Sequence, residues 1–306
     1  MSAFVVVGMG IQGVKRHAIM STHQLITVDP VAEEVDFRRL SDVPLDSYEA
    51  VLLCVPDDPK PELIDFAIEH GKHVLVEKPL FLDPQEYADL SSRASEAAVT
   101  VYVAYNHRFE PHIAAAKRIL DSGEIGEIYT VSLSYGNGTA ALVRASPWRD
   151  RGLGVIADLG SHLLDIVDFW WGLAGRDVDY VDARALENQS YDQAIMRLSG
   201  SPEAYLEATM LSWRNDFRCD IRGSEGSLHI SSLCKWGPTS LTVRGRIRPS
   251  GRPDERTETL VQGDPTWAAE FAHFLNLVST GNPGNLSTSR EIARILSDVS
   301  GRLELP

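Results

Sequence analysis

The sequence has few cysteines, no block of basic residues and no long apolar run, and each absence excludes a class of protein. Cys54, Cys219 and Cys234 are odd in number and far apart, as is typical of reduced thiols rather than of a disulfide framework or a zinc site, so no metal is expected. The formal net charge is -14, which argues against nucleic-acid or anionic-membrane partners. No run approaches the roughly 18 apolar residues that a membrane span needs. Small-molecule chemistry is the favoured class.

The chain enters the apolar stretch AFVVVGMG almost at once, with no basic segment before it. We therefore expect no signal peptide and a cytoplasmic protein. With 306 residues, of which 43% are hydrophobic, the chain is long enough for two domains with separate cores. The sequence contains no repeats and no low-complexity linker.

From residue 3 to about 106, short β-rich runs alternate with helical stretches, a pattern typical of a parallel sheet with crossover helices. Asp83 is the expected N-cap of one helix and Gly71 the expected end of another. The expected strands cover 3–8, 24–29, a weak run near 35–37, 50–56, 73–78 and 100–106. The expected helices begin at 11 and cover 61–70, 84–98 and 111–120.

After Gly123 the pattern changes to strand-like runs joined by short polar turns, which indicates a largely antiparallel sheet. A helix over 158–171 interrupts it, and two helices, over 266–279 and 288–303, end the chain. The expected strands cover 127–136, 178–187, 191–200, 203–213, 217–223, 226–232 and 240–248. The change of pattern predicts two domains, residues 1–120 and 121–306.

The stretch VVVGMGIQG places Gly8, Gly10 and Gly13 at GxGxxG spacing between a strand and a helix. The first glycine allows a tight turn, the second lets the backbone approach a pyrophosphate, and the third permits close helix packing. Asp29 ends the next strand, where its carboxylate can bond a ribose 2′-hydroxyl and repel a 2′-phosphate. The alternative is that Asp29 only makes a turn. The expected cofactor is NAD rather than NADP, and the expected contacts in the loop are Gly8, Met9, Gly10, Ile11, Gln12 and Gly13.

These patterns together predict an α/β protein, with an N-terminal Rossmann dinucleotide-binding domain and a C-terminal α+β domain holding a large, mostly antiparallel open sheet. The strand HVLVEKP ends at Lys78, at the sheet edge where such folds hold their ligands. A surface lysine at a strand end is the alternative.

The stretch ADLGSHLLD places Asp158, His162 and Asp165 at helical spacing on one stripe, beside a second, apolar stripe. This pattern predicts an amphipathic helix with a titratable side. That side is either a functional surface or only the solvated face of the helix.

The segments GMGIQG, CVPDDPK, GKHVLVEKPL, YNHRF and DLGSHLLD resemble, in order and over essentially the whole chain, the glucose-fructose oxidoreductase, inositol dehydrogenase and rhizopine-catabolism (Gfo/Idh/MocA) family. The resemblance implies that Lys78 faces Asp158 and His162 across the nicotinamide. It also implies that His162 acts as acid or base with Lys78 as its electrostatic partner, or the reverse, while Asp158 holds the substrate or tunes its neighbours. Such chemistry moves a hydride to or from the cofactor and a proton to or from a hydroxyl.

The resemblance also implies cofactor contacts beyond the glycine loop, and it has one departure. Relatives often carry T-P-N-x-x-H where this chain has VPDDPK over 55–60, so a threonine hydroxyl and a histidine are missing there. The further expected cofactor contacts are Asp29, Val55, Pro56, Glu77, Lys78, Pro79, Asn106 and Arg108.

The loop RASPWRDRG carries Arg144, Arg149 and Arg151 just before the helix with Asp158. Its guanidiniums could bind a carboxylate or phosphate, which favours a uronate or a nucleotide sugar, or they could simply be solvated. Trp148 is similar to a tryptophan near the cofactor or sugar in the family; otherwise it anchors the loop. The expected substrate contacts are Lys78, Arg144, Trp148, Arg149, Asp158, His162 and Asp165, the last as a direct or a supporting contact.

The leading hypothesis is an NAD-dependent oxidoreductase acting on a hydroxyl or ketone carbon of a cyclic polyol, sugar or nucleotide sugar. The alternatives are an NADPH-dependent sugar ketone reductase and a catalytically silent cofactor-binding sensor. The resemblance implies a homodimer or homotetramer, formed through the outer face of the antiparallel sheet.

Overall fold

The computed structural model describes residues 3–304, which form two compact units. The first comprises the residues up to Asn106 together with Thr266–Ala293, and the second comprises His107–Pro265 together with the segment from Arg294. This division differs from the expected domains 1–120 and 121–306 in two ways: the second unit begins at His107, and Thr266–Ala293 returns to the first unit. The sequence pattern contained no sign of that return.

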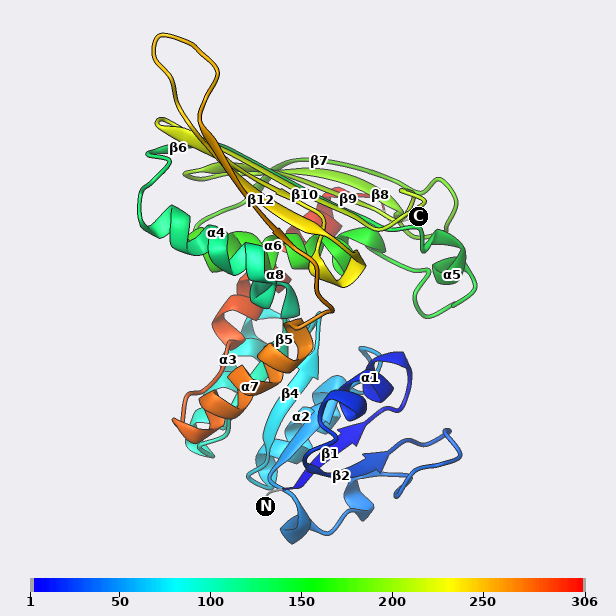
Figure 1. Cartoon of the computed structure of the whole chain (residues 1–306). Helices are drawn as coiled ribbons and strands as arrows, with labels where there is room; N and C mark the ends of the chain where they lie inside the picture. Colours follow the sequence, from blue (N-terminus) through cyan, green and yellow to red (C-terminus); the bar gives the residue numbers. More distant parts are fainter. Residues whose placement is uncertain (1–2, 305–306) are drawn as a thin grey trace. The chain divides into compact units, whose positions relative to one another are not determined.

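A five-stranded parallel sheet forms the centre of the first unit, with strand order β2-β1-β3-β4-β5 (Figure 1). This is the Rossmann-like sheet that the sequence predicted. The weak run near 35–37 contributes only an isolated bridge between Phe37 and Val28. The strands are β1 (Ala3–Val7), β2 (Gln24–Val28), β3 (Ala50–Leu53), β4 (His73–Glu77) and β5 (Val101–Ala104).

Helix α7 belongs to the core of this unit. Its Phe271 and Phe274 pack with Phe4, Leu52 and Leu75 from the sheet, which explains why this late segment joins the first unit. The helices are α1 (Ile11–Ile19), α2 (Lys60–Glu69), α3 (Pro84–Glu96) and α7 (Thr266–Ser279), with short 3-10 turns at Leu40–Asp42, Leu45–Ser47 and η3 (Asn106–Phe109).

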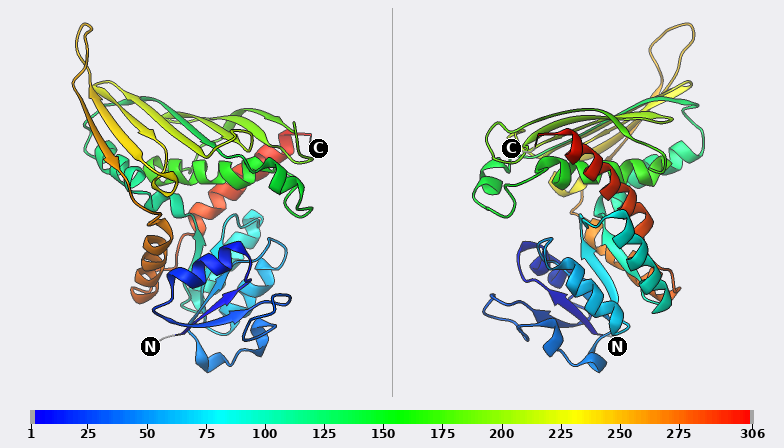
Figure 2. Two further views of the ribbon diagram at one scale, coloured as in Figure 1. Left: turned by 45° about the vertical axis from the view of Figure 1, so that its right-hand side comes forward. Right: turned by 180° about the vertical axis from the view of Figure 1, so that it is seen from behind.

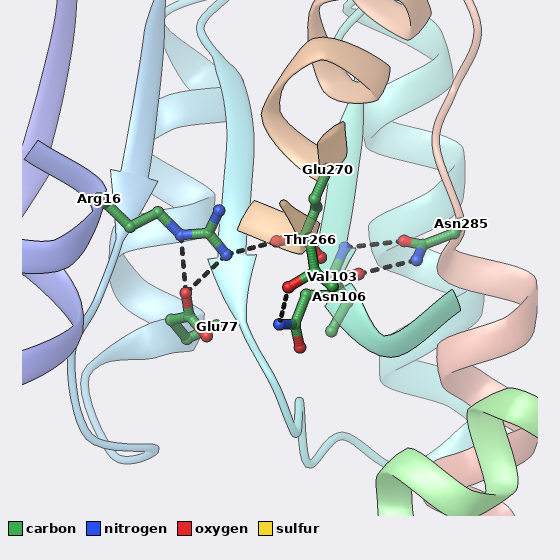
Figure 3. Close-up of polar contacts among 7 residues, drawn as sticks. All are labelled: Arg16, Glu77, Val103, Asn106, Thr266, Glu270 and Asn285. Atoms are coloured by element: carbon green, nitrogen blue, oxygen red, sulfur yellow. Dashed lines mark hydrogen bonds and ion pairs between the residues drawn. The ribbon is translucent and has the colours of Figure 1, made fainter. Parts of the chain in front are cut away.

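The edge of this sheet at β5 is covered by the segment that follows α7. The Asn285 side chain accepts a hydrogen bond from the Val103 N–H at 2.7 Å and donates one to the Val103 carbonyl oxygen at 2.8 Å (Figure 3). The Val101 N–H donates to the Pro283 carbonyl oxygen at 3.0 Å. A side-chain amide thus occupies the place of a neighbouring strand.

The second unit is built on an eight-stranded sheet with strand order β13-β12-β11-β10-β6-β9-β8-β7. All neighbours are antiparallel except β6 and β9, so the sheet is mostly antiparallel, as predicted. Strand β13 was not expected, since its residues are nearly all exposed and lack apolar alternation. The strands are β6 (Ile128–Gly136), β7 (Val178–Arg184), β8 (Gln193–Leu198), β9 (Glu203–Thr209), β10 (Asp216–Gly223), β11 (Gly226–Ser231), β12 (Thr239–Gly245) and β13 (Glu255–Leu260).

Helices cover one face of this sheet, and among the described residues no element covers the other (Figure 2). Along β8 and β9 every second residue is buried, while Ile195 and Tyr205 on the open face are exposed. No described helix is long and apolar enough to cross a membrane. The helices are α4 (Pro111–Asp121), α5 (Ala140–Arg144), α6 (Ser161–Trp171) after a π-helical turn (Ile156–Gly160), the 3-10 turn η5 (Cys234–Trp236) and α8 (Leu286–Arg302), which begins in the first unit.

Candidate active site

The glycine loop between β1 and α1 has a backbone that side chains would obstruct. Gly8 has a φ of +89°, and a Cβ there would lie 2.5 Å from the Cys54 carbonyl oxygen. A Cβ on Gly13 would lie 1.8 Å from the Gly8 carbonyl oxygen, so α1 packs directly on the loop. No atom lies within 4 Å of the place that a Cβ of Gly10 would take. The loop therefore fits a pyrophosphate, which can approach the backbone at Gly10 and the N-terminus of α1.

Asp29 lies against this loop. Its Oδ2 accepts a hydrogen bond from the Met9 N–H at 2.7 Å, and its Oδ1 accepts bonds from Val31 and Ala32, both at 2.8 Å. Burial raises the pKa of Asp29, but these backbone hydrogen bonds outweigh it and hold the pKa below its usual range. Asp29 is therefore a charged group beside the glycine loop, and it also makes the turn that was the alternative.

A buried lysine joins the unusual VPDDPK segment to the turn after β4. Lys60 is 2% exposed, and its ammonium donates to the Pro79 carbonyl oxygen at 2.7 Å and to Asp57 Oδ1 at 2.6 Å. Burial lowers the pKa of Lys60, against the opposing effect of Asp57. Val55 lies beside the glycine loop, with its side chain 3.0 Å from the place that a Cβ of Gly8 would take. The departure from the family pattern therefore has a structural role of its own.

Arg16 ties α1 to β4 and α7. It is 1% exposed, and it donates from Nε to Glu77 Oε1 at 2.8 Å and from Nη2 to Glu270 Oε2 at 2.7 Å (Figure 3). Asn106 Nδ2 donates to Thr266 Oγ1 at 2.8 Å. Helix α7 thus holds the ends of both β4 and β5, where the parallel strands present their carboxyl ends. Lys78, the expected catalytic lysine, directly follows Glu77 at the end of β4 and is partly exposed.

The helix with the D-x-G-x-H pattern is not amphipathic in the way that the sequence predicted. A π-helical turn over 156–160 contains Asp158, and α6 begins only at Ser161. His162 is 8% exposed and Asp165 is 0% exposed, so the side that carries them is not the solvated face that was one of the two alternatives. The reason is that α6 packs against both α4 and the sheet. Asp158, in the turn, keeps partial exposure.

His162 is packed in an aromatic cluster that sequence reasoning missed. Its ring lies 3.9 Å from that of His107, with 36° between the planes, and 6.1 Å from the ring of Tyr135. Lys235 Nζ lies 3.0 Å from His107 Nε2. The sheet and η3 bring these residues together from distant parts of the chain. No local spacing could have grouped them.

Arg108 and Asp165 pair with each other. The guanidinium bonds both carboxylate oxygens of Asp165 and lies 3.7 Å from Asp168 Oδ2. Burial raises the pKa of Asp165 to about 6, although Arg108 opposes the rise. The pairing favours the supporting role for Asp165. Arg108, which was expected to contact the cofactor, is thus paired with a carboxylate of α6.

The loop before the π-helical turn is anchored at Asp150, whereas its Trp148 is exposed. Asp150 is buried and accepts bonds from the N–H and hydroxyl of Ser190 at 2.8 and 2.9 Å. Arg149 Nη2 lies 3.4 Å from Asp158 Oδ2. Arg144 donates to the carbonyl oxygen of residue 187 at 3.0 Å. Trp148 is 54% exposed, so it does not pack on the core as a loop anchor would.

In the first unit, Asp29 thus contacts the glycine loop and Glu77 contacts Arg16 of α1. In the second, Arg149 lies next to Asp158 in the π-helical turn, and His162 follows at the start of α6. Within residues 3–304, no group of three His, Cys, Asp or Glu side chains is arranged to hold a metal ion.

Both units match models of one family. Residues 3–105 match an oxidoreductase family with an NAD-binding Rossmann fold, and residues 113–229 match the GFO/IDH/MocA C-terminal domain. Scyllo-inositol 2-dehydrogenase (NAD(+)) of Bacillus subtilis is 30% identical over 272 residues, covering 83% of this chain and 75% of its own. Inositol 2-dehydrogenase of Rhizobium meliloti is 26% identical and covers 66% of this chain and 62% of its own.

Solved structures show the same fold at lower identity. Levoglucosan dehydrogenase in complex with NADH has a TM-score of 0.83 at 18% identity, covering 98% of this chain and 97% of its own. UDP-N-acetylglucosamine 3-dehydrogenase of Acidithiobacillus ferrooxidans has a TM-score of 0.77 at 21% identity, covering 99% and 97%. With its glycine loop, its two kinds of sheet and its matches in both units, this chain belongs to the GFO/IDH/MocA family of NAD(P)-dependent oxidoreductases.

Proposed function

We propose that this protein is an NAD-dependent dehydrogenase that interconverts a secondary alcohol and a ketone on a cyclic polyol, a sugar or a nucleotide sugar. The observation that carries the proposal is the glycine loop, with its open backbone at Gly10 and the charged Asp29 beside it. When bound there, NAD would accept the hydride in alcohol oxidation, and NADH would supply it in ketone reduction. The substrate class follows the named activities of relatives, which act on scyllo-inositol, levoglucosan and UDP-N-acetylglucosamine.

The proposed catalytic residues are His162, Lys78 and Asp158. His162 exchanges the hydroxyl proton, because an imidazole titrates close to neutral pH. Lys78 polarises the reacting oxygen, and Asp158 holds the substrate, although Lys78 and His162 could exchange roles. The proposal requires Lys78 and His162 to act on one substrate, and kinetic measurements on variants of both residues test this requirement.

The proposed specificity loop carries Arg144, Arg149 and Trp148. The exposed Trp148 offers an aromatic surface for a sugar ring, and Arg149 lies next to Asp158, so the two could bind neighbouring substrate groups. These features favour a substrate with an anionic group, such as a uronate or a nucleotide sugar.

A substrate screen tests the activity. The protein is incubated with NAD, and then with NADP, over free polyols, hexoses, uronates and nucleotide sugars, and the absorbance of the reduced nicotinamide is recorded. On an accepted substrate, His162→Asn and Lys78→Ala should each lower kcat by about 10²- to 10⁴-fold. Their losses should not add up in the double variant, since the two residues act on one step.

Lys117→Ala is the matched control, because Lys117 pairs with Asp121 on the surface of α4 and should leave turnover unchanged. Full turnover by Lys78→Ala would contradict the site assignment. NAD binding without turnover on any substrate would favour the catalytically silent sensor.

An NADPH-dependent ketone reductase is the second candidate, and one observation favours it. Arg38 donates to the Asp29 carbonyl oxygen at 3.3 Å, so a guanidinium that could receive a 2′-phosphate lies beside the acidic residue. Titration of NADH and NADPH separates the two cases. We expect NADH to bind at least about tenfold more tightly, and Asp29→Ala to remove the preference. Tighter binding of NADPH by the unaltered protein would contradict our assignment.

We also propose a homodimer or homotetramer in the cytoplasm. The open face of the eight-stranded sheet, with Ile195 and Tyr205 exposed, supports an interface with a second copy. The three unpaired thiols support a reducing compartment. Sedimentation equilibrium measures the oligomeric state, and an Ile195→Asp variant should weaken the assembly.

A further inference from the structure

We propose that Lys235 and His107 are positioning residues that keep His162 neutral, so that it can accept a proton from the substrate. This inference rests on the role of His162 in the proposed function. It concerns two residues of the second unit that were not among the expected site residues: His107, within the YNHRF segment, and Lys235, on η5.

The contact between Lys235 and His107 fixes the tautomer of His107. Lys235 Nζ lies 3.0 Å from His107 Nε2. An ammonium can only donate hydrogen bonds, so Nε2 must accept, and the single ring proton of His107 lies on Nδ1. His107 is 1% exposed, which disfavours its charged form further. The ring that stacks on His162 at 3.9 Å is therefore a neutral imidazole.

The lysine is held in place on several sides. Its Nζ also donates to the Tyr135 hydroxyl at 3.3 Å and lies 4.7 Å from the centre of the Trp236 ring. The preceding residue, Cys234, donates from its backbone N–H and from its thiol to the carboxylate of Glu110, both at 2.9 Å.

Glu110 also links the lysine to the histidine. Its own N–H donates to the His107 carbonyl oxygen at 2.9 Å, and its carboxylate is 1% exposed. One buried side chain thus fixes both the turn that carries Lys235 and the turn that carries His107. The arrangement is a built part of the second unit, unlike the contact of a mobile surface lysine.

The charges around His162 have opposite effects. Lys235 disfavours protonation, and so would any proton on His107, because two stacked imidazolium rings repel each other. Asp158 and Asp264 favour protonation; both act on Tyr135, whose pKa is raised mainly by burial and which therefore stays neutral. Other charged groups of this unit are paired with neighbours of their own: Arg149 with Asp158, Arg108 with Asp165 and Asp168, and Glu110 with Cys234.

Removing the positive charge of Lys235 must therefore raise the pH at which His162 gains its proton. The loss of this charge shifts the titration of His162 upward, whatever the nearby carboxylates contribute. Loss of one nearby charge typically shifts the titration of a buried group by about one pH unit, so we expect a rise of that size.

Titration of the histidine ring nitrogens by NMR tests this inference on the intact protein without substrate. The His162 signals are assigned by their loss in His162→Gln. Lys235→Gln, which keeps a hydrogen-bond donor but loses the charge, should raise the His162 midpoint by about one pH unit, whereas Lys235→Arg should leave it near its original value. Lys117→Gln is the control and should have no effect. An unchanged midpoint in folded Lys235→Gln would overturn the inference.

The pH profile of kcat/KM for an accepted substrate gives the second readout. In Lys235→Gln the acidic limb of alcohol oxidation should move upward with the NMR midpoint. If the midpoint moves and the profile does not, Lys235 controls His162 as proposed, and the assignment of His162 as the proton acceptor fails instead. If Lys235→Gln does not fold, His107→Asn, which removes the stacked ring but not the ammonium, should still alter the midpoint. A midpoint equal to that of the unaltered protein would then overturn the inference.

Discussion

Burial controls the chemistry of each cysteine residue. Burial raises the pKa of Cys54, Cys219 and Cys234, and with Glu110 beside it the pKa of Cys234 reaches about 12. A thiol reacts as its thiolate, which is scarce at neutral pH in all three cases. We predict that no cysteine of the folded protein reacts with a disulfide reagent at pH 7, and that all three react in denaturant. A rapidly reacting thiol in the folded state would show that one of these sites opens.

Asp165 makes stability depend on pH in a defined range. Its folded pKa of about 6 lies above the unfolded value of about 3.9, so the folded state binds this proton more tightly. The resulting stabilisation is complete below about pH 4 and is lost as the pH rises through 6, a change of about 3 kcal/mol.

We therefore predict that the unfolding free energy of the unaltered protein, minus that of Asp165→Asn, falls between pH 4 and pH 7. Urea unfolding at several pH values measures it. Asp121→Asn, at an exposed position, should show no such trend. A difference that is constant or rises with pH would mean that Arg108, rather than burial, dominates at this site.

At the scale of elements, Arg16 of α1 links this helix to β4 and α7 through the carboxylates of Glu77 and Glu270. Losing the guanidinium would break the ion pairs of Arg16 with Glu77 and with the fully buried Glu270, and breaking a buried pair typically costs about 3–5 kcal/mol. We predict a loss of that size for Arg16→Met and a smaller one for Arg16→Lys, measured by urea unfolding. The exposed pair of Arg93 and Asp65 is the matched control, and Arg93→Met should cost under about 1 kcal/mol. Equal losses in both variants would contradict the role of burial.

Elements with local signals were predictable from the sequence. Asp83 caps α3 in a capping box with Glu86, at the residue where the sequence placed the start of that helix. Strand β13 carries no apolar alternation because both its faces are exposed, so its pairing with β12 left no mark in its residues. The π-helical turn before α6 is likewise invisible to a pattern that assumes regular helical spacing.

The residues of the candidate site likewise divide into those with a local sequence signal and those without one. The glycines and Asp29 lie close in sequence and form a recognisable motif, and the fold brings Asp29 to Met9 as that motif requires. Arg16 and Lys235 lie in none of the segments that carry the resemblance, and Lys60 lies where this chain departs from the family pattern. Their partners lie on other elements, so only the fold reveals that they are buried and paired.

At the scale of the whole molecule, the first unit is completed by residues near the end of the chain. Helix α7 supplies Phe271 and Phe274 to its core, and Glu270 to Arg16. We predict that a chain ending at Pro265 does not bind NADH, because its Rossmann sheet has lost the packing of one face. Tryptophan fluorescence with added NADH measures binding. Binding as tight as that of the full chain would show that residues 3–106 fold without α7.

The amide of Asn285 has a consequence for the behaviour of this protein in concentrated solution. An uncovered strand edge offers unpaired N–H and carbonyl groups to any extended peptide that meets it, and so can template chain-to-chain growth. At β5 the side chain of Asn285 fills that role for Val103 through two hydrogen bonds. A replacement such as Asn285→Leu would unmask the edge while the strand order stayed the same, and the danger it creates is aggregation rather than loss of chemistry.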